Sequence, residues 1–103
     1  MNKDINQKEI IERISKIRTE SNLSARALSQ MINKSDAYIN HLEAGIHVEP
    51  SLSTLLDICE ACNTPLEKFF YYDMDQYEID KKLLNFFKTL SQKQKEAILN
   101  LYR

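Results

Sequence analysis

The sequence contains few residues that interrupt a helix, with one glycine, two prolines and no tryptophan among 103 residues. Tight hairpin turns depend on glycine, and half-buried strands alternate apolar and polar residues, but neither signal is present. No apolar run approaches the roughly 20 residues that span a bilayer. The opening MNKDINQKEI also lacks the apolar segment of a secretion signal. These absences predict an all-α protein of the cytoplasm that does not enter a membrane.

Cysteine is also scarce. The only two cysteines are Cys59 and Cys62, and the only two histidines, His41 and His47, are neither paired nor close in sequence. A zinc site takes about four ligands, so this set does not favour one. On a helix over 52–62 both thiols lie on the apolar face, which predicts reduced core cysteines and neither a metal nor a cofactor.

Features of an enzyme are missing as well. The sequence shows no paired carboxylates in a plausible cleft, no nucleophile with a neighbouring base and no glycine-rich phosphate loop. The 14 basic and 15 acidic side chains give a net charge of −1, which does not by itself favour a polyanionic partner. We expect a protein without catalytic activity, and any nucleic-acid site must come from basic residues that the fold gathers on one surface.

What is present is helical periodicity along the whole chain. Serine and threonine at predicted helix starts, including Ser24, Ser35 and Thr64, are expected to cap them, and Ser91 with Gln94 forms a capping box. The predicted helices cover approximately 6–21, 25–32, 35–44, 52–62, 65–70, 79–90 and 92–103. Their expected buried faces contain Ile10, Ile14, Ile17, Leu28, Met31, Ile32, Ile39, Leu42, Leu52, Leu55 and Ile58.

Two turns are expected to use the left-handed backbone conformation. Asn33 follows the second predicted helix and Gly45 the third. Asparagine and glycine adopt this conformation more readily than other residues do. The second and third helices are therefore joined by a tight turn, so that they cross at a large angle with one face of the third helix free.

That free face of the helix at 35–44 carries small and polar side chains. Asp36, Ala37, Asn40 and His41 lie opposite the apolar Ile39 and Leu42. Base edges in a major groove offer donors, acceptors and thymine methyl groups, which such side chains can contact. A polar face that is simply solvated fits this pattern equally well.

The stretch LSARALSQMINKSDAYINHLEAG, followed by PS, LLDICEACN and TPLEKFF, resembles the Cro/repressor-type (XRE) helix-turn-helix family over residues 7–70. The positions that match the family pattern are Arg18, Leu23, Ser24, Leu28, Ser35, Ile39, Glu43, Gly45, Pro50 and Ser51. The resemblance implies an all-α, five-helix, lambda-repressor-like DNA-binding domain at 1–70 that binds double-stranded DNA.

The resemblance also implies roles for individual residues. Ser24 would hold a phosphate, the polar face of the third helix would read bases, and Arg18 would form a structural ion pair with Glu43. The full set of implied DNA contacts is Ser24, Arg26, Lys34, Ser35, Asp36, Ala37, Tyr38, Asn40 and His41. Ala25 departs from the family, which often has a glutamine there that contacts DNA, and the carboxylate of Asp36 repels phosphates. We therefore expect weak binding by a monomer.

The remainder of the chain is expected to be a linker at 71–78 and a two-helix extension at 79–103. Its predicted helices carry two apolar stripes, formed by Ile79, Leu83, Phe86, Phe87 and Leu90 and by Ile98, Leu101 and Tyr102. An apolar surface of this size needs a cover. Either the extension forms a homodimer, as helix-turn-helix proteins commonly do to meet two half-sites, or it folds back on the core of its own chain.

Together these features predict a sequence-specific DNA-binding transcription regulator, more specifically a repressor. The alternative is a protein-interaction module, antitoxin-like or anti-repressor-like, whose C-terminal helices bind a partner protein.

Overall fold

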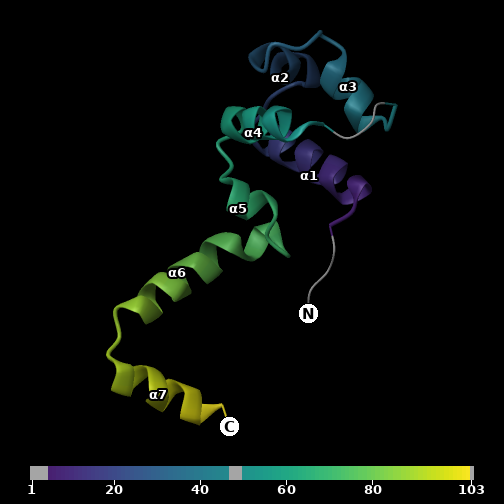
Figure 1. The fold of residues 1–103 in the computed structure, drawn as a ribbon. Helices are drawn as coiled ribbons and strands as arrows, with labels where there is room; N and C mark the ends of the chain where they lie inside the picture. The colour runs from purple at the N-terminus through teal and green to yellow at the C-terminus, as the bar shows by residue number, and fades with distance from the viewer. Residues whose placement is uncertain (1–4, 47–49, 103) are drawn as a thin grey trace. The chain divides into compact units, whose positions relative to one another are not determined.

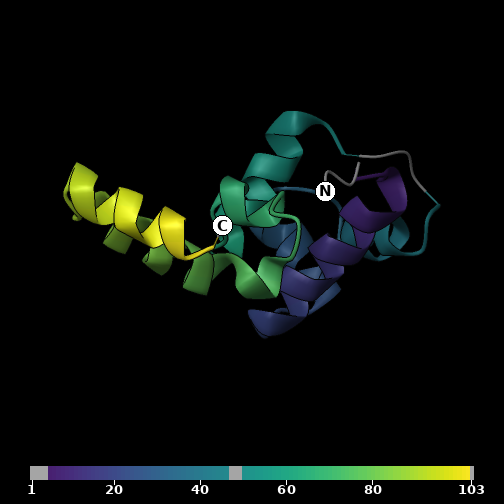
Figure 2. The same ribbon diagram turned by 90° about the horizontal axis from the view of Figure 1, so that it is seen from below.

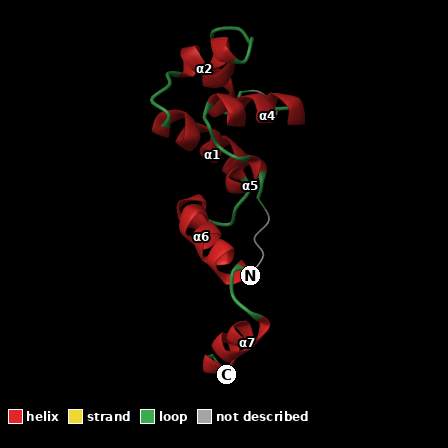
Figure 3. Ribbon diagram, turned by 90° about the vertical axis from the view of Figure 1, so that its left-hand side faces the viewer, coloured by secondary structure: helices red, strands yellow, loops and turns green. Residues whose placement is uncertain are grey.

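The computed structural model describes residues 5–46 and 50–102, and within these ranges the chain forms helices and connecting loops without a strand (Figure 3). In chain order the helices are α1 (Gln7–Glu20), α2 (Ala25–Met31), α3 (Tyr38–Glu43), α4 (Leu52–Ala61), α5 (Leu66–Phe69), the 3₁₀ helix η1 (Met74–Gln76), α6 (Tyr77–Lys88) and α7 (Gln92–Leu101) (Figure 1). The prediction of an all-α protein is therefore confirmed. Over the same ranges, none of the helices has the length and apolarity that crossing a bilayer requires.

The chain divides into two compact units, Met1–Tyr72 and Asp73–Arg103. The first unit contains α1 to α5. Side-chain oxygens cap three of its helices: Asn6 accepts the Glu9 N–H at the start of α1, Ser24 the Ala27 N–H at α2, and Ser51 the Thr54 N–H at α4. Each cap satisfies one of the backbone donors that a helix start leaves unpaired.

The core of the first unit is small and aliphatic, closed by one aromatic ring. Helices α2 and α3 lie side by side, and both α1 and α4 contact this pair (Figure 1). Side chains with almost no exposed surface come from every helix of the unit: Ile14, Ile17, Leu28, Ile39, Leu42, Ile58 and Phe69. Cys59 and Cys62 are free and buried in the same core, as predicted from their place on the apolar face.

Left-handed residues end four helices of this unit. Asn22 (φ 58°), Asn33 (φ 60°) and Asn63 (φ 49°) follow α1, α2 and α4, and Gly45 (φ 75°) follows α3. The expected conformations of Asn33 and Gly45 are confirmed. The asparagine turns allow each helix to stop and reverse without a second glycine.

Arg13 fixes the end of the first unit. Its guanidinium donates to the carbonyl oxygens of Phe69 at 2.6 Å, of Tyr71 and of Tyr72 at 3.2 Å. These carbonyls belong to the end of α5 and the residues after it, where no further helical N–H is available to them. One cation on α1 thus holds three carbonyl groups of the distant segment from Phe69 to Tyr72.

Three local predictions were wrong. Met31 and Leu52, expected in the core, are 54% and 65% exposed, because the core takes Leu28 and Leu55 from these helices instead. Thr64 does not cap α5; its hydroxyl donates to the carbonyl of Cys62, and the N-cap position is Pro65. Because a tight turn separates α4 from the short α5, the Thr64 hydroxyl lies nearer the end of α4 than the start of α5.

The second unit contains η1, α6 and α7, so helical structure begins at Met74, within the stretch expected as a linker. Ser91 and Gln94 form the predicted capping box at the start of α7. The most notable property of α6 and α7 is the exposure of large apolar side chains, each at least 40% accessible: Ile79, Leu83, Leu84, Phe86, Phe87, Leu99, Leu101 and Tyr102.

Candidate nucleic-acid interface

Helix α3 is shorter than the sequence suggests. It begins at Tyr38 rather than next to Ser35, and Asp36 and Ala37 form a turn in front of it. The expected cap at Ser35 is wrong, since Ser35 contributes its carbonyl oxygen, which accepts the Tyr38 N–H at 3.0 Å. The N-cap position is Ala37, whose side chain can make no hydrogen bond.

The missing cap comes from the neighbouring helix. Ser29 on α2 is fully buried, and its hydroxyl oxygen accepts the N–H of Ile39, the second residue of α3, at 3.0 Å. The same hydroxyl donates to the carbonyl of Ala25 at 2.8 Å. A side chain of α2 thus makes the hydrogen bond that a local N-cap usually makes, and fixes where α3 starts.

Two apolar side chains hold the inner face of α3. Ile39 and Leu42 have no exposed surface, whereas Asn40 is exposed and His41 is partly exposed. Within the described part of the chain, the side-chain amide of Asn40 makes no hydrogen bond to protein. Its donor and acceptor therefore remain available to a ligand on the outer face.

An ion pair fixes the end of α3. The guanidinium of Arg18 on α1 donates to both carboxylate oxygens of Glu43, at 2.7 and 2.9 Å, and to the carbonyl of Leu23 at 2.9 Å. Each side chain of the pair is only 16% exposed. The hydrogen bond to Glu43 raises the pKa of Arg18 above its ordinary value, despite the opposing effect of burial. Both ends of α3 are thus tied to other helices.

The turn before α3 carries a second, exposed ion pair. Asp36 Oδ2 lies 3.2 Å from Arg26 Nε, and Asp36 Oδ1 accepts from the Gln30 side-chain amide at 3.1 Å. Arg26 and Gln30 are one turn apart on α2. The charge of Asp36, which we expected to face a base or repel a phosphate by itself, is therefore balanced within the protein.

The remaining predicted contact residues lie next to α3 and at the start of α2. Lys34 places its ammonium group 5.3 Å from the centre of the Tyr38 ring, and burial raises the pKa of the Tyr38 phenol. Ser24 is exposed at the start of α2, where its hydroxyl oxygen already accepts the Ala27 N–H at 2.9 Å. Its hydroxyl hydrogen can still be donated to an acceptor outside the protein.

The structure brings several of the predicted residues to one surface. Ala25, Arg26, Asp36, Ala37 and Asn40 line a single open hollow between the start of α2 and the start of α3. This hollow combines a cation, a carboxylate, an amide and two methyl groups. Such a mixture can donate to, accept from and make apolar contact with the edges of base pairs.

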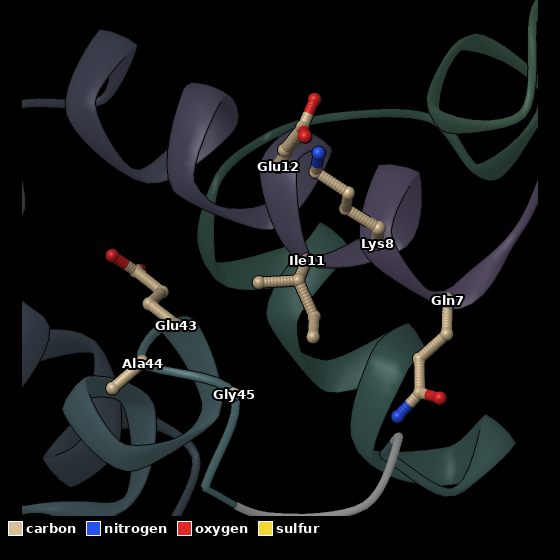
Figure 4. A pocket seen from close by; sticks show the side chains of 7 residues that line it. All are labelled: Gln7, Lys8, Ile11, Glu12, Glu43, Ala44 and Gly45. Carbon is tan, nitrogen blue, oxygen red and sulfur yellow. The ribbon is translucent and has the colours of Figure 1, made fainter.

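Helix α1 contacts α3 (Figure 2). A second hollow lies at the opposite end of α3, beside the first turns of α1. It is lined by Gln7, Lys8, Ile11, Glu12, Glu43, Ala44 and Gly45, and Figure 4 shows Ile11 between the polar side chains of α1 and the end of α3. Of the polar side chains that line this hollow, Glu43 is already engaged by Arg18.

The two cysteines show no sign of a reactive site. Burial raises the pKa of Cys59 to about 11, with a further contribution from Cys62, so the thiol stays protonated at neutral pH. Among the residues that the structure describes, no three histidine, cysteine or acidic side chains are grouped so that they could hold a metal ion.

Sequence reasoning missed two residues of this surface. Ser29 is fully buried and positions the start of α3, and Gln30 holds Asp36; neither residue is among the contacts expected from the sequence. The sequence carries one signal for Ser29. It directly follows the core residue Leu28, and on a short helix the next position can still face a neighbouring helix.

Known proteins share this fold and sequence pattern. A solved structure, described as a SinR protein/SinI protein complex, contains a chain that is similar over 90% of the present chain and 93% of its own, with a TM-score of 0.55 and 17% sequence identity. No curated protein sequence matches the chain. A family model described as helix-turn-helix matches residues 14–69, which is more than half of the chain and contains α2 and α3. With the helix-turn-helix geometry in place and this match, the protein belongs to the Cro/repressor-type (XRE) helix-turn-helix family of DNA-binding regulators.

Proposed function

We propose that the protein is a sequence-specific transcription repressor that reads the major groove of double-stranded DNA with residues 35–44. One observation carries this proposal. Helix α3 is fixed by Ile39 and Leu42 on its inner face, whereas Asn40 on its outer face is exposed and makes no hydrogen bond to the described part of the protein. A fixed helix with the Asn40 amide available on its outer face suits direct reading of bases.

Each side chain has a contact that its chemistry suits. Asn40 pairs with adenine through its donor and acceptor, His41 donates to guanine, and Ala37 contacts a thymine methyl group. Ser24 and the N-terminal N–H groups of α2 hold a phosphate, because unpaired N–H donors and the helix dipole favour an anion there. Lys34, Ser35 and Tyr38 border this face and contact the backbone of the same strand.

The proposed mechanism involves occupancy alone. A protein bound over a promoter excludes polymerase without performing a reaction. This role places the protein in the cytoplasm with the DNA that it binds.

The test is a titration of fluorescent duplexes, chosen by selection from random DNA, with Asn40→Ala and His41→Ala. Each variant should bind the selected duplex more weakly by about 1–3 kcal/mol and unfold at nearly the parental temperature, since both side chains lie on the outer face. Asn85→Ala is the matched control, because it removes an exposed asparagine of α6 on the side opposite Leu83. Parental affinity in both variants would exclude base reading by α3.

We further propose that residues 79–103 form a homodimer. The apolar side chains that α6 and α7 expose include Leu83 and Phe86, at 48% and 55%, and a surface of this kind requires a partner. A dimer also doubles the contact with DNA, because two recognition helices can meet half-sites about one helical turn apart.

Light scattering tests the proposed dimer by measuring the mass of the protein in solution. The full chain should have twice the mass of one chain, and both deletion of 79–103 and Leu83→Glu should give a monomer. Asn85→Glu introduces the same charge on the opposite side of α6 and should keep the dimer. If all four proteins contain the same number of chains per particle, the proposed dimer through 79–103 is excluded.

A second candidate is a module that binds another protein through the same apolar helices. The similar solved structure is a complex of the SinR and SinI proteins. A monomeric full chain with exposed α6 and α7 would favour such a heterologous partner. Failure to select any DNA sequence would favour it further.

A further inference from the structure

The carboxylate of Asp36 is held by two side chains of α2, although Asp36 itself belongs to the turn before α3. One oxygen meets Arg26 Nε at 3.2 Å and the other accepts from the Gln30 amide at 3.1 Å. Arg26 and Asp36 remain 72% and 57% exposed. In water such an exposed pair contributes little to folding, so stability is a weak reason for this arrangement.

The geometry of the pair leaves the two terminal guanidinium nitrogens of Arg26 available to a ligand. Asp36 lies against Nε, on the side of the guanidinium, and in the described part of the chain the two terminal nitrogens donate no hydrogen bond. These nitrogens form the planar fork that can donate to both O6 and N7 of a guanine. Arg26, Asp36 and Asn40 also line the same hollow, so an oriented Arg26 lies on the surface proposed to read DNA.

We propose that Asp36 is a positioning residue that orients Arg26 to recognise one guanine. This inference rests on the proposed function. A carboxylate at this position repels phosphates, whereas its pairing with Arg26 partly balances that charge and restricts the directions that the long Arg26 side chain can take. The gain is selectivity for one base pair, because the fork is aligned before the DNA arrives.

The experiment measures binding of the full chain to its selected duplex and to duplexes in which each base pair is changed in turn. Arg26→Ala should lose discrimination at one G·C pair, on the order of 5- to 150-fold. Asp36→Ala should lose part of the discrimination at that same pair, while its affinity for unrelated DNA rises because a negative charge is gone. In the double variant, removal of Asp36 should change discrimination no further, since Asp36 acts through Arg26.

Two variants control for charge and for shape. Asp57→Ala removes an exposed carboxylate of α4 and should leave the pattern of discrimination unchanged. Arg26→Lys keeps the charge without the fork and should lose the guanine preference while retaining general affinity.

The outcomes separate this inference from the proposed function. A parent protein that selects no sequence overturns both. A selective parent whose Asp36 and Arg26 variants affect different base pairs, or whose losses add in the double variant, overturns the positioning role alone. The same holds if Asp36→Ala changes affinity equally for all duplexes, which would make its effect purely electrostatic.

Discussion

Helix α3 of the first unit and helix α6 of the second are both amphipathic, but the apolar face of α3 is buried and that of α6 is exposed. Ile39 and Leu42 of α3 have no exposed surface, whereas Leu83 and Phe86 of α6 are about half exposed. Helix α3 is further tied by Ser29 at its start and by Arg18 near its end. Helix α3 has thus buried its apolar face within one chain, whereas α6 presents an apolar face that is still exposed. Under the proposed function, α3 is held in place to read DNA and the exposed face of α6 is covered by a second copy of the chain.

Two leucines provide the sharpest test of this contrast. Leu42→Ala should lower the free energy of unfolding by about 2–5 kcal/mol, because it removes a fully buried side chain and leaves a cavity. Leu83→Ala, the same change at a half-exposed site, should cost the first unit almost nothing and instead weaken association. Urea unfolding followed by circular dichroism, at a concentration where both variants are monomeric, measures the difference. Similar losses in the two variants would refute the contrast.

The Arg18–Glu43 pair should have the next largest effect. Arg18→Met leaves the carboxylate of Glu43 partly buried without its cation, and we expect a loss of about 1–3 kcal/mol in the free energy of unfolding. The double variant Arg18→Met/Glu43→Leu should recover most of this loss, since no charge is then left unpaired. The comparison is made by thermal and urea unfolding at neutral pH. If the double variant is as unstable as the sum of the single ones, the two residues do not act as a pair.

Ser29→Ala should lower the free energy of unfolding less than the Arg18 variant does. Its main effect should be local, at the start of α3. Loss of the hydroxyl leaves the buried Ile39 N–H without its acceptor, at a cost of about 1–2 kcal/mol. Hydrogen exchange should show faster opening at Ile39 and Asn40 than in the parent, with α4 unchanged. Ser53→Ala, at an exposed position of α4, is the control, and equal exchange in the two variants would show that α3 does not depend on Ser29.

The features predicted correctly from the sequence depend on residues that are close along the chain. The left-handed Asn33 and Gly45 and the capping box of Ser91 follow from local conformation and hydrogen bonding, which the sequence order fixes directly. The wrong predictions concern caps and faces decided by other helices. Ser35 stands where a cap belongs, but Ser29 of α2 makes that hydrogen bond. Periodicity places Met31 on an apolar face, and only the packing of α2 against its neighbours shows that it is exposed.

In the candidate site, too, some features follow from local spacing and others depend on how the helices pack. Helical spacing groups Asn40 and His41, and their polarity indicates the outer face without further information. Helical spacing does not reveal that Arg26 and Gln30 of α2 contact Asp36 in the turn before α3. Residues six to ten positions apart meet only when two short helices take a particular angle.

The hydroxyl of Ser29 also limits how this protein can be re-engineered. Grafting residues 36–44 onto another scaffold would transfer the side chains that face outward and leave behind the oxygen that sets the first turn of the helix. A chimera with a different DNA preference should therefore exchange α2 and α3 together, or supply a serine from the host at the matching depth.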